Sequence, residues 1–588
     1  MKALCIAVLS LLGSVSLSAQ PARGRVDYSN IAVDVSALPQ EKAFLAEMIL
    51  KRAQDRTVFS EKAKTLAVSF KLDESLKGDD AEVTVKDGRA VVRAGRFRGL
   101  IFGAGELLRA ATWREEAFSL DDGELAFRPV KTLRASYWAR HFHNWYHLAT
   151  AAELKEYAED LALWGVNGFA YQFVFPTVDR TGAIPYDIER FEKTSREVYA
   201  HLAAMDLDFL GSGGGNQAPQ DSPAQFRGEP NVNPKRGNLG FNVCPAKPGA
   251  MDYMLGLREK VFKSDTLKGV RPQWLTYWPY DEGGCGCATC SPWGGRGYLK
   301  MCKRFAEANA AQWPGAKNIV STWVFDDDDW DGLYKYLATD ESKWIDALMV
   351  DSHTEFPEYP LTHKLPRPVP IVTFPEISMW GRHPWGGFGA TALPARFERL
   401  FRSVEKIVSG FKFYSEGRFE DFNKVVVTRL YANPSQSWQD IARDYCRWEL
   451  PGVDAEDFIR LIGLLEKDHV FPAFRKPAEI TKDVGHGELA NTDDYERRCR
   501  EGLAVATEAA ALADRIEHQI SFPMRPCWRW RLFRIRTIVD RELYAARDWH
   551  TPKADECYRE LMRFNLSEPV PGLYRNRSAH GAVRPWVD

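Results

Sequence analysis

The chain has 588 residues, of which 45% are hydrophobic. This length is enough for a barrel of about 250 residues together with smaller domains of about 150 residues. Lys and Arg number 78 and Asp and Glu number 80, which gives a formal net charge of −2. A charge so close to zero gives no electrostatic reason to expect a nucleic acid or an anionic membrane surface as a partner.

Residues 1–19 are typical of a signal peptide. Lys2 supplies a positive charge, Ala3 to Leu12 is apolar, and the small residues from Ser14 to Ala19 suit cleavage near Ala19. The apolar run is too short to span a bilayer, and no later segment approaches 18 uninterrupted apolar residues. We therefore expect export to the periplasm or outside the cell, without membrane insertion.

Residues 26–130 are predicted to form a small α/β domain. Residues 40–55 have apolar spacing that suits a helix, and three half-buried strands are expected at 66–70, 81–85 and 90–93. A glycine-rich segment from Arg98 leads into a second helix. Its glycines do not follow a dinucleotide-binding fingerprint, so we do not expect phosphate binding there.

Residues 131–430 repeat a strand-then-helix pattern. Eight strands are predicted, at 135–141, 166–175, 207–211, 273–280, 318–325, 347–351, 370–374 and 410–414. Helices are predicted between most of them, at 151–163, 188–205, 249–263, 298–312 and 395–407. This alternation favours a TIM (β/α)8 barrel, with an open doubly wound sheet as the alternative. Residues 431–588 read as a helical domain.

Polar and acidic residues follow the predicted strands, where barrel enzymes carry their active sites. The fourth strand ends in Tyr280, Asp281 and Glu282. Glycosidic bond cleavage needs one protonated carboxyl group to assist the leaving oxygen and a second group to act at the anomeric carbon. Two adjacent carboxylates move each other's pKa apart, which suits this division of roles. The alternative is a solvated acidic loop.

Other residues after the strands are weighed as second candidates. Glu376 and Glu416 are possible partners for Glu282 in a two-carboxylate mechanism. His141 is expected to bond sugar hydroxyls rather than to bind a metal, and a purely structural histidine, which is commoner in proteins, is the alternative. The run from Asp326 to Asp329 is interpreted as a solvated acidic loop, because its spacing does not suit a calcium loop.

Four cysteines form a separate pattern. Cys244 follows the third strand, and Cys285, Cys287 and Cys290 follow the fourth. Four thiolates in neighbouring barrel loops would suit a tetrahedral structural zinc ion. Disulfides are equally compatible with an exported protein, and free buried thiols are a third reading. In each case we expect the cluster to brace the loop that carries the acidic pair.

The front domain and the acidic pair together resemble glycoside hydrolase family 20, the β-N-acetylhexosaminidases. The shared features are a "GL-F-G---LL" helix start after Arg98 and Asp-Glu at the end of the fourth strand. The resemblance implies that Asp281 orients the acetamido group of the substrate and that Glu282 is the general acid. It also implies substrate contacts for three further residues, Arg134, Trp380 and Glu416. The usual "GGDE" run is absent, since Trp278, Pro279 and Tyr280 precede the pair.

A second resemblance competes with the first. Cys244-Pro followed by Asp281, Gly283-Gly284 and the three later cysteines is similar to a "CP-NP … DGG-C-C--C" pattern of glycoside hydrolase family 163, the endo-β-N-acetylglucosaminidases. Alpha-glucuronidases also combine a comparable front domain with a barrel, and they need no acetamido-orienting residue.

These features lead to the hypothesis of an exported glycoside hydrolase that cleaves N-acetylhexosaminide linkages by substrate-assisted, retaining catalysis. An alpha-glucuronidase or another glycosidase with two carboxylates is the first alternative, and a non-catalytic carbohydrate-binding barrel is the second. A glycan is the expected partner. Catalysis requires no cofactor in this hypothesis, and a zinc ion would be structural.

Overall fold

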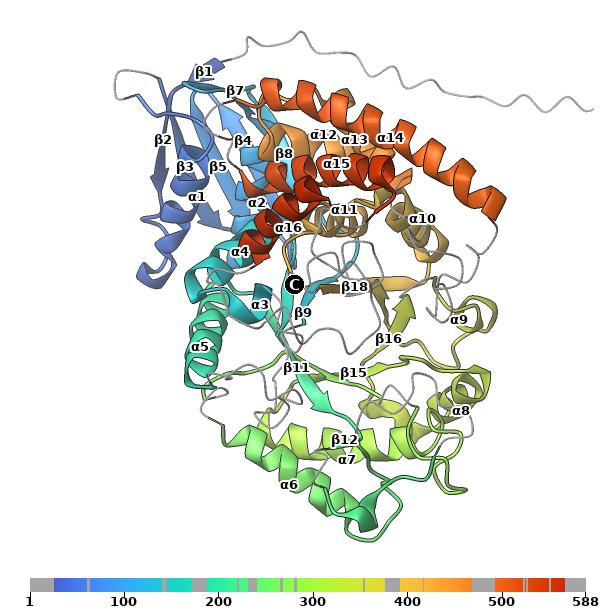
Figure 1. The fold of residues 1–588 in the computed structure, drawn as a ribbon. Helices are drawn as coiled ribbons and strands as arrows, with labels where there is room; N and C mark the ends of the chain where they lie inside the picture. The colour runs from blue at the N-terminus through green and yellow to red at the C-terminus, as the bar shows by residue number, and fades with distance from the viewer. Residues whose placement is uncertain are drawn as a thin grey trace, which may run out of the picture.

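The chain folds into a front α/β domain, a barrel and a helical C-terminal region (Figure 1). The structure is a computed structural model that describes residues 26–60, 64–139, 145–171, 188–218, 222–230, 241–264, 268–279, 283–352, 355–375, 392–415, 417–467, 492–521, 524, 527–548 and 551–565. Over these ranges, no helix combines the length and the apolar character needed to cross a membrane.

The front domain is a five-stranded sheet with helices packed on it. The strand order is β2-β3-β5-β4-β8, with bounds Asn30–Asp34, Thr65–Leu72, Arg89–Ala94, Ala81–Lys86 and Gly123–Phe127. Helices α1 (Phe44–Gln54) and α2 (Phe97–Ala110) pack against this sheet. A separate three-stranded sheet has the order β1-β7-β6, with bounds Val26–Tyr28, Phe118–Leu120 and Thr112–Trp113. The predicted strands and helices are confirmed. Buried and exposed residues alternate along β4 and β5, as expected for a sheet with one covered face.

Two glycines of α2 allow the helix to pack closely against the sheet of the front domain. A Cβ atom on Gly99 would lie 2.7 Å from the Ala94 side chain, and one on Gly103 would lie 2.6 Å from Val92. Both distances are too short for carbon atoms, so glycine is needed where the helix touches the sheet.

The barrel is closed by eight parallel strands in the order β10-β11-β14-β15-β16-β17-β18-β9. Their bounds are Gly168–Tyr171, Asp208–Gly214, Trp274–Tyr277, Lys317–Ser321, Ala347–Ser352, Ile371–Pro375, Val408–Ser415 and Leu133–Trp138. The longer helices between them are α4 (Ala151–Leu163), α5 (Ile188–Ala204), α6 (Ala250–Phe262), α7 (Gly297–Gln312), α8 (Asp327–Leu337) and α10 (Pro394–Val404), and α11 (Asp421–Ala432) follows the last strand. The short helices α3 (Trp145–Leu148) and α9 (Tyr359–Thr362) follow β9 and β16. The predicted (β/α)8 barrel is confirmed, and the open sheet is excluded.

Helix α8 corrects one expectation. The acidic run that was interpreted as a loop is the start of this helix. Asp326 caps it, accepting a hydrogen bond from the backbone N–H of Asp329 at 3.0 Å. Asp329 is itself buried and accepts a 2.7 Å bond from the N–H of Gly294. Carboxylates are favoured here because the first N–H groups of a helix lack intrahelical partners and carry partial positive charge.

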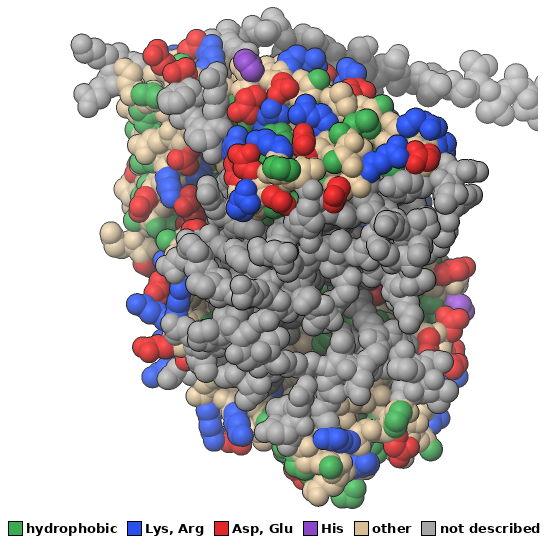
Figure 2. Space-filling model, in the orientation of Figure 1, with side chains coloured by type: hydrophobic (Ala, Val, Ile, Leu, Met, Phe, Trp, Pro, Cys, Tyr) green, Lys and Arg blue, Asp and Glu red, His purple; other side chains and the backbone are tan. Residues whose placement is uncertain are grey.

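The described residues of the C-terminal region form helices joined by short turns, and none of them forms a strand. The region comprises α12 (Trp438–Glu449), α13 (Ala455–Lys467), α14 (Thr492–Gln519), α15 (Trp528–Ala546) and α16 (Pro552–Asn565). The barrel helix α11 ends at Ala432, so the predicted boundary at 430/431 falls in its last turn. Side chains of both charge signs are interspersed over these helices (Figure 2).

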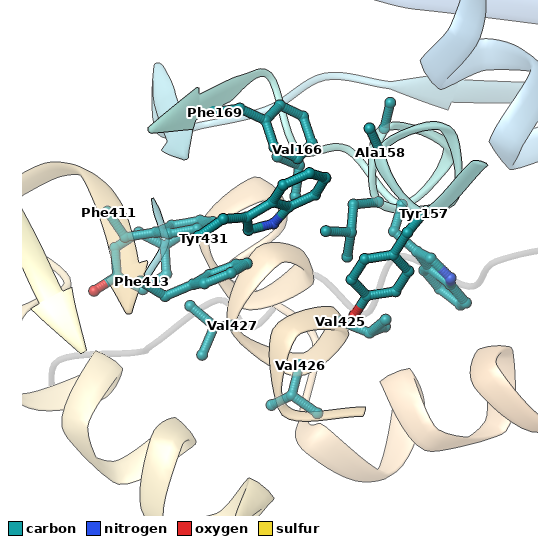
Figure 3. Close-up of a cluster of buried hydrophobic side chains, with 14 of the residues drawn as sticks. Tyr157, Ala158, Val166, Phe169, Phe411, Phe413, Val425, Val426, Val427 and Tyr431 are labelled. Carbon is teal, nitrogen blue, oxygen red and sulfur yellow. The ribbon is translucent and has the colours of Figure 1, made fainter. Parts of the chain in front are cut away.

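Aromatic and aliphatic side chains join the barrel strands to the surrounding helices. Figure 3 shows Phe169 from β10 and Phe411 and Phe413 from β18 near residues of α4 and α11. Phe411 lies 4.9 Å from Tyr431 of α11, measured between ring centroids. The outward faces of the strands therefore form the main hydrophobic core together with the helices.

A buried ionic cluster fixes the front domain to the barrel. Asp79 accepts hydrogen bonds from Arg98 at 2.5 Å and from Arg134 at 2.9 Å, and a third bond of 2.7 Å comes from the Asn167 amide. Burial alone would raise the pKa of Asp79, but Arg134 and Arg98 outweigh that effect and the pKa is lowered. The carboxylate therefore stays charged inside this contact.

A second cluster joins all three parts of the chain. Arg529 of α15 pairs with Asp421 at 2.7 Å, with Asp160 at 2.9 Å and with Glu449 at 3.4 Å. Arg56 of the front domain reaches Glu449 at 2.8 Å. The helical region thus contacts the front domain and the barrel through one set of buried charges.

We expect Asp79→Asn to destabilise the protein strongly. The substitution keeps the shape of the side chain but leaves two buried guanidinium groups facing a neutral amide. The free energy of unfolding at pH 7 should fall by about 3–5 kcal/mol, as for other buried ion pairs that lose one partner. Denaturant unfolding followed by tryptophan fluorescence measures the change.

The pH dependence adds a check to this prediction. The folded pKa of Asp79 is lowered, so its contribution is present above the unfolded pKa of about 3.9 and is lost as the pH falls through the folded value. The difference between wild type and variant should therefore shrink below about pH 4. Asp340→Asn is the control, since Asp340 pairs with Lys343 on the surface and is 91% exposed. Equal midpoints for wild type and Asp79→Asn at pH 7 would contradict the prediction.

Candidate active site

The interior of the barrel is lined by alternate residues of each strand. Leu133, Ala135 and Tyr137 of β9 belong to the interior cluster, whereas Trp138 belongs to the outer core. On β18, Tyr414 belongs to the interior cluster and its neighbour Phe413 to the outer core. This alternation follows from the two-residue period of a strand, and it decides which side chains line the centre of the barrel at its carboxyl end.

Five aromatic side chains gather inside the barrel near the carboxyl ends of its strands. We call them the interior aromatic cluster: Tyr137, Trp278, Trp323, Phe374 and Tyr414. The ring centroids of Trp278 and Phe374 are 5.1 Å apart, those of Trp278 and Trp323 are 5.5 Å apart, and those of Tyr137 and Tyr414 are 5.4 Å apart. Flat apolar rings of this kind suit packing against the C–H face of a sugar.

Lys412 places a cation inside the barrel beside this cluster. It lies on β18 between Gly410 and Tyr414 and is 3% exposed. Its Nζ donates to Thr276 Oγ1 at 3.1 Å across the barrel and lies 4.9 Å from the ring centroid of Tyr137. Within the described ranges no carboxylate forms an ion pair with it. Burial lowers the pKa of Lys412 to about 7.

Asp351 supplies a carboxylate at the same end of the barrel. Ala347 and Met349 of β16 line the interior, so alternation places Asp351 on the same face. It pairs in register with Phe374 of β17 and is half-buried. Asp351 is the last residue of a predicted strand, but the sequence pattern alone does not single it out as a site residue.

The predicted acidic pair, Asp281 and Glu282, lies outside the described residues, as does Tyr280. Their flanks are described. Strand β14 ends at Tyr277, and Trp278 belongs to the interior aromatic cluster. After the pair, Gly284 has a φ of +84°, and a Cβ atom there would lie 2.1 Å from the Trp293 ring. The chain beyond the pair therefore turns in a way that requires glycine.

Four further predicted residues, His141, Glu376, Trp380 and Glu416, also lie outside the described residues. They follow strands β9, β17 and β18 in the sequence. Next to Glu416, the carbonyl oxygen of Gly417 accepts bonds from the Tyr146 hydroxyl at 2.8 Å and the Ser415 hydroxyl at 2.9 Å. The chain is thus held firmly on the carboxyl side of that position.

Arg134 does not suit the role that the family resemblance implied. It is the second residue of β9, so it lies at the amino end of the strand and not at the carboxyl end. Its side chain is fully buried and bonds to Asp79, to the Gly165 carbonyl at 2.7 Å and to the Lys131 carbonyl at 2.7 Å. The prediction of sugar binding by Arg134 is therefore corrected: this residue joins the front domain to the barrel.

The four predicted cysteines meet in one place. The Sγ atoms of Cys244, Cys285, Cys287 and Cys290 all lie within 4.8 Å of one another, and none forms a disulfide. A hydrogen bond from the Cys290 thiol lowers the pKa of Cys285, and backbone N–H groups of Cys287 and Glu229 act in the same direction. The predicted convergence of two loops is thereby confirmed.

Tyr137, Trp323, Lys412 and Asp351 were missed by the sequence reasoning. The signal that identifies them is alternation within each strand, once its register is fixed. Lys412 is the most unusual of the four, because a lysine side chain is rarely buried in the interior of a protein.

The fold resembles those of solved glycoside hydrolases. No protein-family model and no curated protein matches the sequence. A family GH115 4-O-methyl-alpha-glucuronidase with specificity for decorated arabinogalactans aligns with 10% identity over 96% of this chain and 78% of its own, with a TM-score of 0.60. A family 89 glycoside hydrolase from Clostridium perfringens, in complex with 2-acetamido-1,2-dideoxynojirmycin, aligns with 11% identity over 90% of this chain and 64% of its own, with a TM-score of 0.58.

The solved structures give little support to the two family resemblances that were drawn from the sequence. A GH20 exo-β-N-acetylglucosaminidase from Vibrio harveyi aligns with 12% identity over 72% of this chain and 74% of its own, but its TM-score of 0.48 is too low to carry an argument. Nothing in the comparisons supports the resemblance to family 163. At these identities the neighbours establish the barrel fold, and the chemistry has to be argued from the site.

We expect Lys412→Met to stabilise the protein at low pH. Methionine fills a similar volume without a charge. Because the folded pKa of Lys412 is lowered to about 7, the buried charge costs most below pH 7, where both the folded and unfolded chains are protonated. This cost declines as the pH rises towards the unfolded pKa of about 10.4. The gain should be about 1–4 kcal/mol at pH 6 and smaller at pH 9.

Thermal and denaturant unfolding at both pH values test this expectation. Lys335→Met is the control, since Lys335 is 78% exposed on α8. A gain that does not depend on pH, or a loss of stability at pH 6, would show that the ammonium group of Lys412 is well compensated inside the barrel.

Proposed function

We propose that the protein is a glycoside hydrolase whose active site lies at the carboxyl end of the barrel. The observation that carries this proposal is the interior aromatic cluster, which includes Trp278 directly after β14. Three positions beyond Trp278 the sequence continues with Asp281 and Glu282. An apolar ring surface next to carboxylic acids is the combination that sugar binding and glycosidic bond cleavage require.

In the proposed reaction the substrate is an N-acetylhexosaminide. Glu282 donates a proton to the glycosidic oxygen as the bond from that oxygen to the anomeric carbon breaks. The acetamido oxygen of the substrate, oriented by Asp281, forms a new bond to the same carbon and gives a cyclic oxazolinium. Water then opens this ring, with Glu282 taking the proton from the water. The anomeric configuration is retained because the carbon is attacked twice, from opposite faces.

Tyr280, His141, Glu376, Trp380 and Glu416 are proposed to contact the sugar. They follow barrel strands in the sequence, as active-site residues of barrel enzymes do. The reaction uses carboxyl groups and the acetamido group of the substrate, so it needs no metal or organic cofactor. We also propose that the protein is exported and acts on glycans outside the cytoplasm, on the basis of the signal-like residues 1–19.

A second candidate function is the hydrolysis of a glycoside of an acidic sugar. The observation that favours it is Lys412, a buried cation beside Tyr137 and Thr276. A carboxylate on the substrate would be attracted to such a group in a low-dielectric interior. In this reading Glu282 acts with Glu376 or Glu416 and the acetamido-orienting role of Asp281 is not used.

We expect Glu282→Gln to abolish turnover while sugar binding is retained. The amide has the size of the acid but cannot donate the proton, so kcat should fall by about 10²–10⁴-fold. Turnover is measured with aryl N-acetylglucosaminide, aryl glucuronide and natural N-glycan substrates, and binding is measured by calorimetry. Glu341→Gln, at a carboxylate that is 71% exposed on the surface, is the control and should keep full activity.

The outcomes separate the candidate functions. Turnover of the N-acetylglucosaminide with inhibition by a thiazoline, which mimics the cyclised intermediate, supports the leading proposal. Turnover of the glucuronide alone, with loss in Lys412→Met, supports the second. Binding of glycans without turnover of any substrate would replace both with a carbohydrate-binding protein.

A further inference from the structure

The cysteine cluster draws its members from two distant segments. Cys244 lies between β13 (Phe241–Asn242) and helix α6. Cys285, Cys287 and Cys290 lie between β14 and helix α7. The two segments belong to neighbouring connections of the barrel, and the cluster is the point where they meet.

The arrangement of the sulfur atoms suits one central ion rather than two disulfides. Cys244 Sγ lies 3.9 Å from Cys287 Sγ and 3.8 Å from Cys290 Sγ. A disulfide needs about 2.0 Å between its sulfur atoms. In contrast, four thiolates at ~2.3 Å from a tetrahedral zinc ion are ~3.8 Å apart. Since Cys244 is equally close to two other cysteines, no pair is singled out for a covalent bond.

The surroundings favour a closed structural site. Cys244, Cys285 and Cys290 are each 1% exposed, and Cys287 is half-buried. The group contains four thiols and neither histidine nor carboxylate. A set of four protein ligands leaves no position for water or substrate, which is the pattern of structural rather than catalytic zinc. Soft thiolate ligands favour zinc over magnesium, calcium or manganese.

Hydrogen bonds from backbone N–H groups hold the ligand-bearing segments in place. The N–H of Glu229 points at Cys285 Sγ at 3.3 Å, and the N–H of Gly286 donates to the Glu229 carbonyl at 3.0 Å. The N–H of Cys290 donates to the Cys287 carbonyl at 2.9 Å, which forms the tight turn of a C-x2-C pair. Such outer contacts orient metal ligands and reduce the cost of assembling their negative charge.

We propose that Cys244, Cys285, Cys287 and Cys290 bind one Zn²⁺ as four thiolates. Each thiol releases its proton when the ion binds, and no electron is transferred. The ion fixes the part of the β14–α7 connection that follows the Asp281-Glu282 pair to the segment between β11 and α6. Its role is positional, and the proposal does not depend on which glycoside the protein cleaves.

The metal content of the full-length protein tests this proposal directly. The protein is purified without chelators or added reductant, and its metals are measured by inductively coupled plasma mass spectrometry. We expect about one zinc per chain. X-ray absorption at the zinc edge should show four sulfur neighbours at ~2.3 Å and no nitrogen or oxygen neighbour.

Variants with matched controls assign the ion to the four cysteines. Cys287→Ser and Cys290→Ser should each lower the zinc content at least tenfold. Cys302→Ser and Cys446→Ser should retain it, since these cysteines are also buried but lie on helices α7 and α12 outside the cluster. Should the cluster variants fail to fold, titration of the wild type with a mercurial reagent gives the same answer, because zinc release should follow the modification of four thiols.

Three results would overturn the proposal. One is a chain without stoichiometric metal whose peptide map shows disulfides among these cysteines. Another is one iron per chain with a visible absorption band. The third is zinc that survives Cys287→Ser and Cys290→Ser. Because metal content and thiol chemistry are measured without a substrate, failure here is distinguishable from failure of the proposed hydrolase activity.

Discussion

Successive side chains of a strand point to opposite faces, and in a closed barrel one of those faces is the interior. Every property of the candidate site depends on this constraint. It sends Tyr137, Phe374 and Tyr414 inward while their neighbours pack against helices. It also forces Lys412 into the centre of the barrel. A shift of one residue in a single strand would exchange its interior set for its outer set.

Most of the fold could be predicted from the sequence because strands and helices alternate with clear apolar periods. Helix α4 was predicted at 151–163 and begins with a Thr150-Glu153 capping box that marks its start. Helix α8 was not predicted, because four consecutive aspartates look like a loop until Asp326 is seen to cap a helix. The glycine-rich start of α2 has a structural cause, contact with Ala94 and Val92, which only the packing reveals.

The site was less predictable than the fold. The chain order shows which residues follow a strand, but the face on which a side chain lies depends on register, so Lys412 and Tyr137 were missed. The approach of Cys244 to Cys285, Cys287 and Cys290 was predicted, because the connections after two neighbouring barrel strands lie side by side. Arg134 shows the opposite error: a resemblance gave it a role at the substrate, although its place at the amino end of β9 puts it among the residues of the domain contact.

The buried charges around Arg529 limit how this protein can be divided. Arg56, Asp160, Asp421 and Glu449 belong to three parts of the chain but share one set of ion pairs. A shortened chain that stopped after the barrel would leave Asp160 and Asp421 without Arg529, and Arg56 without Glu449 of α12. The barrel therefore cannot be expressed without the helical region unless Arg56, Asp160 and Asp421 are also replaced.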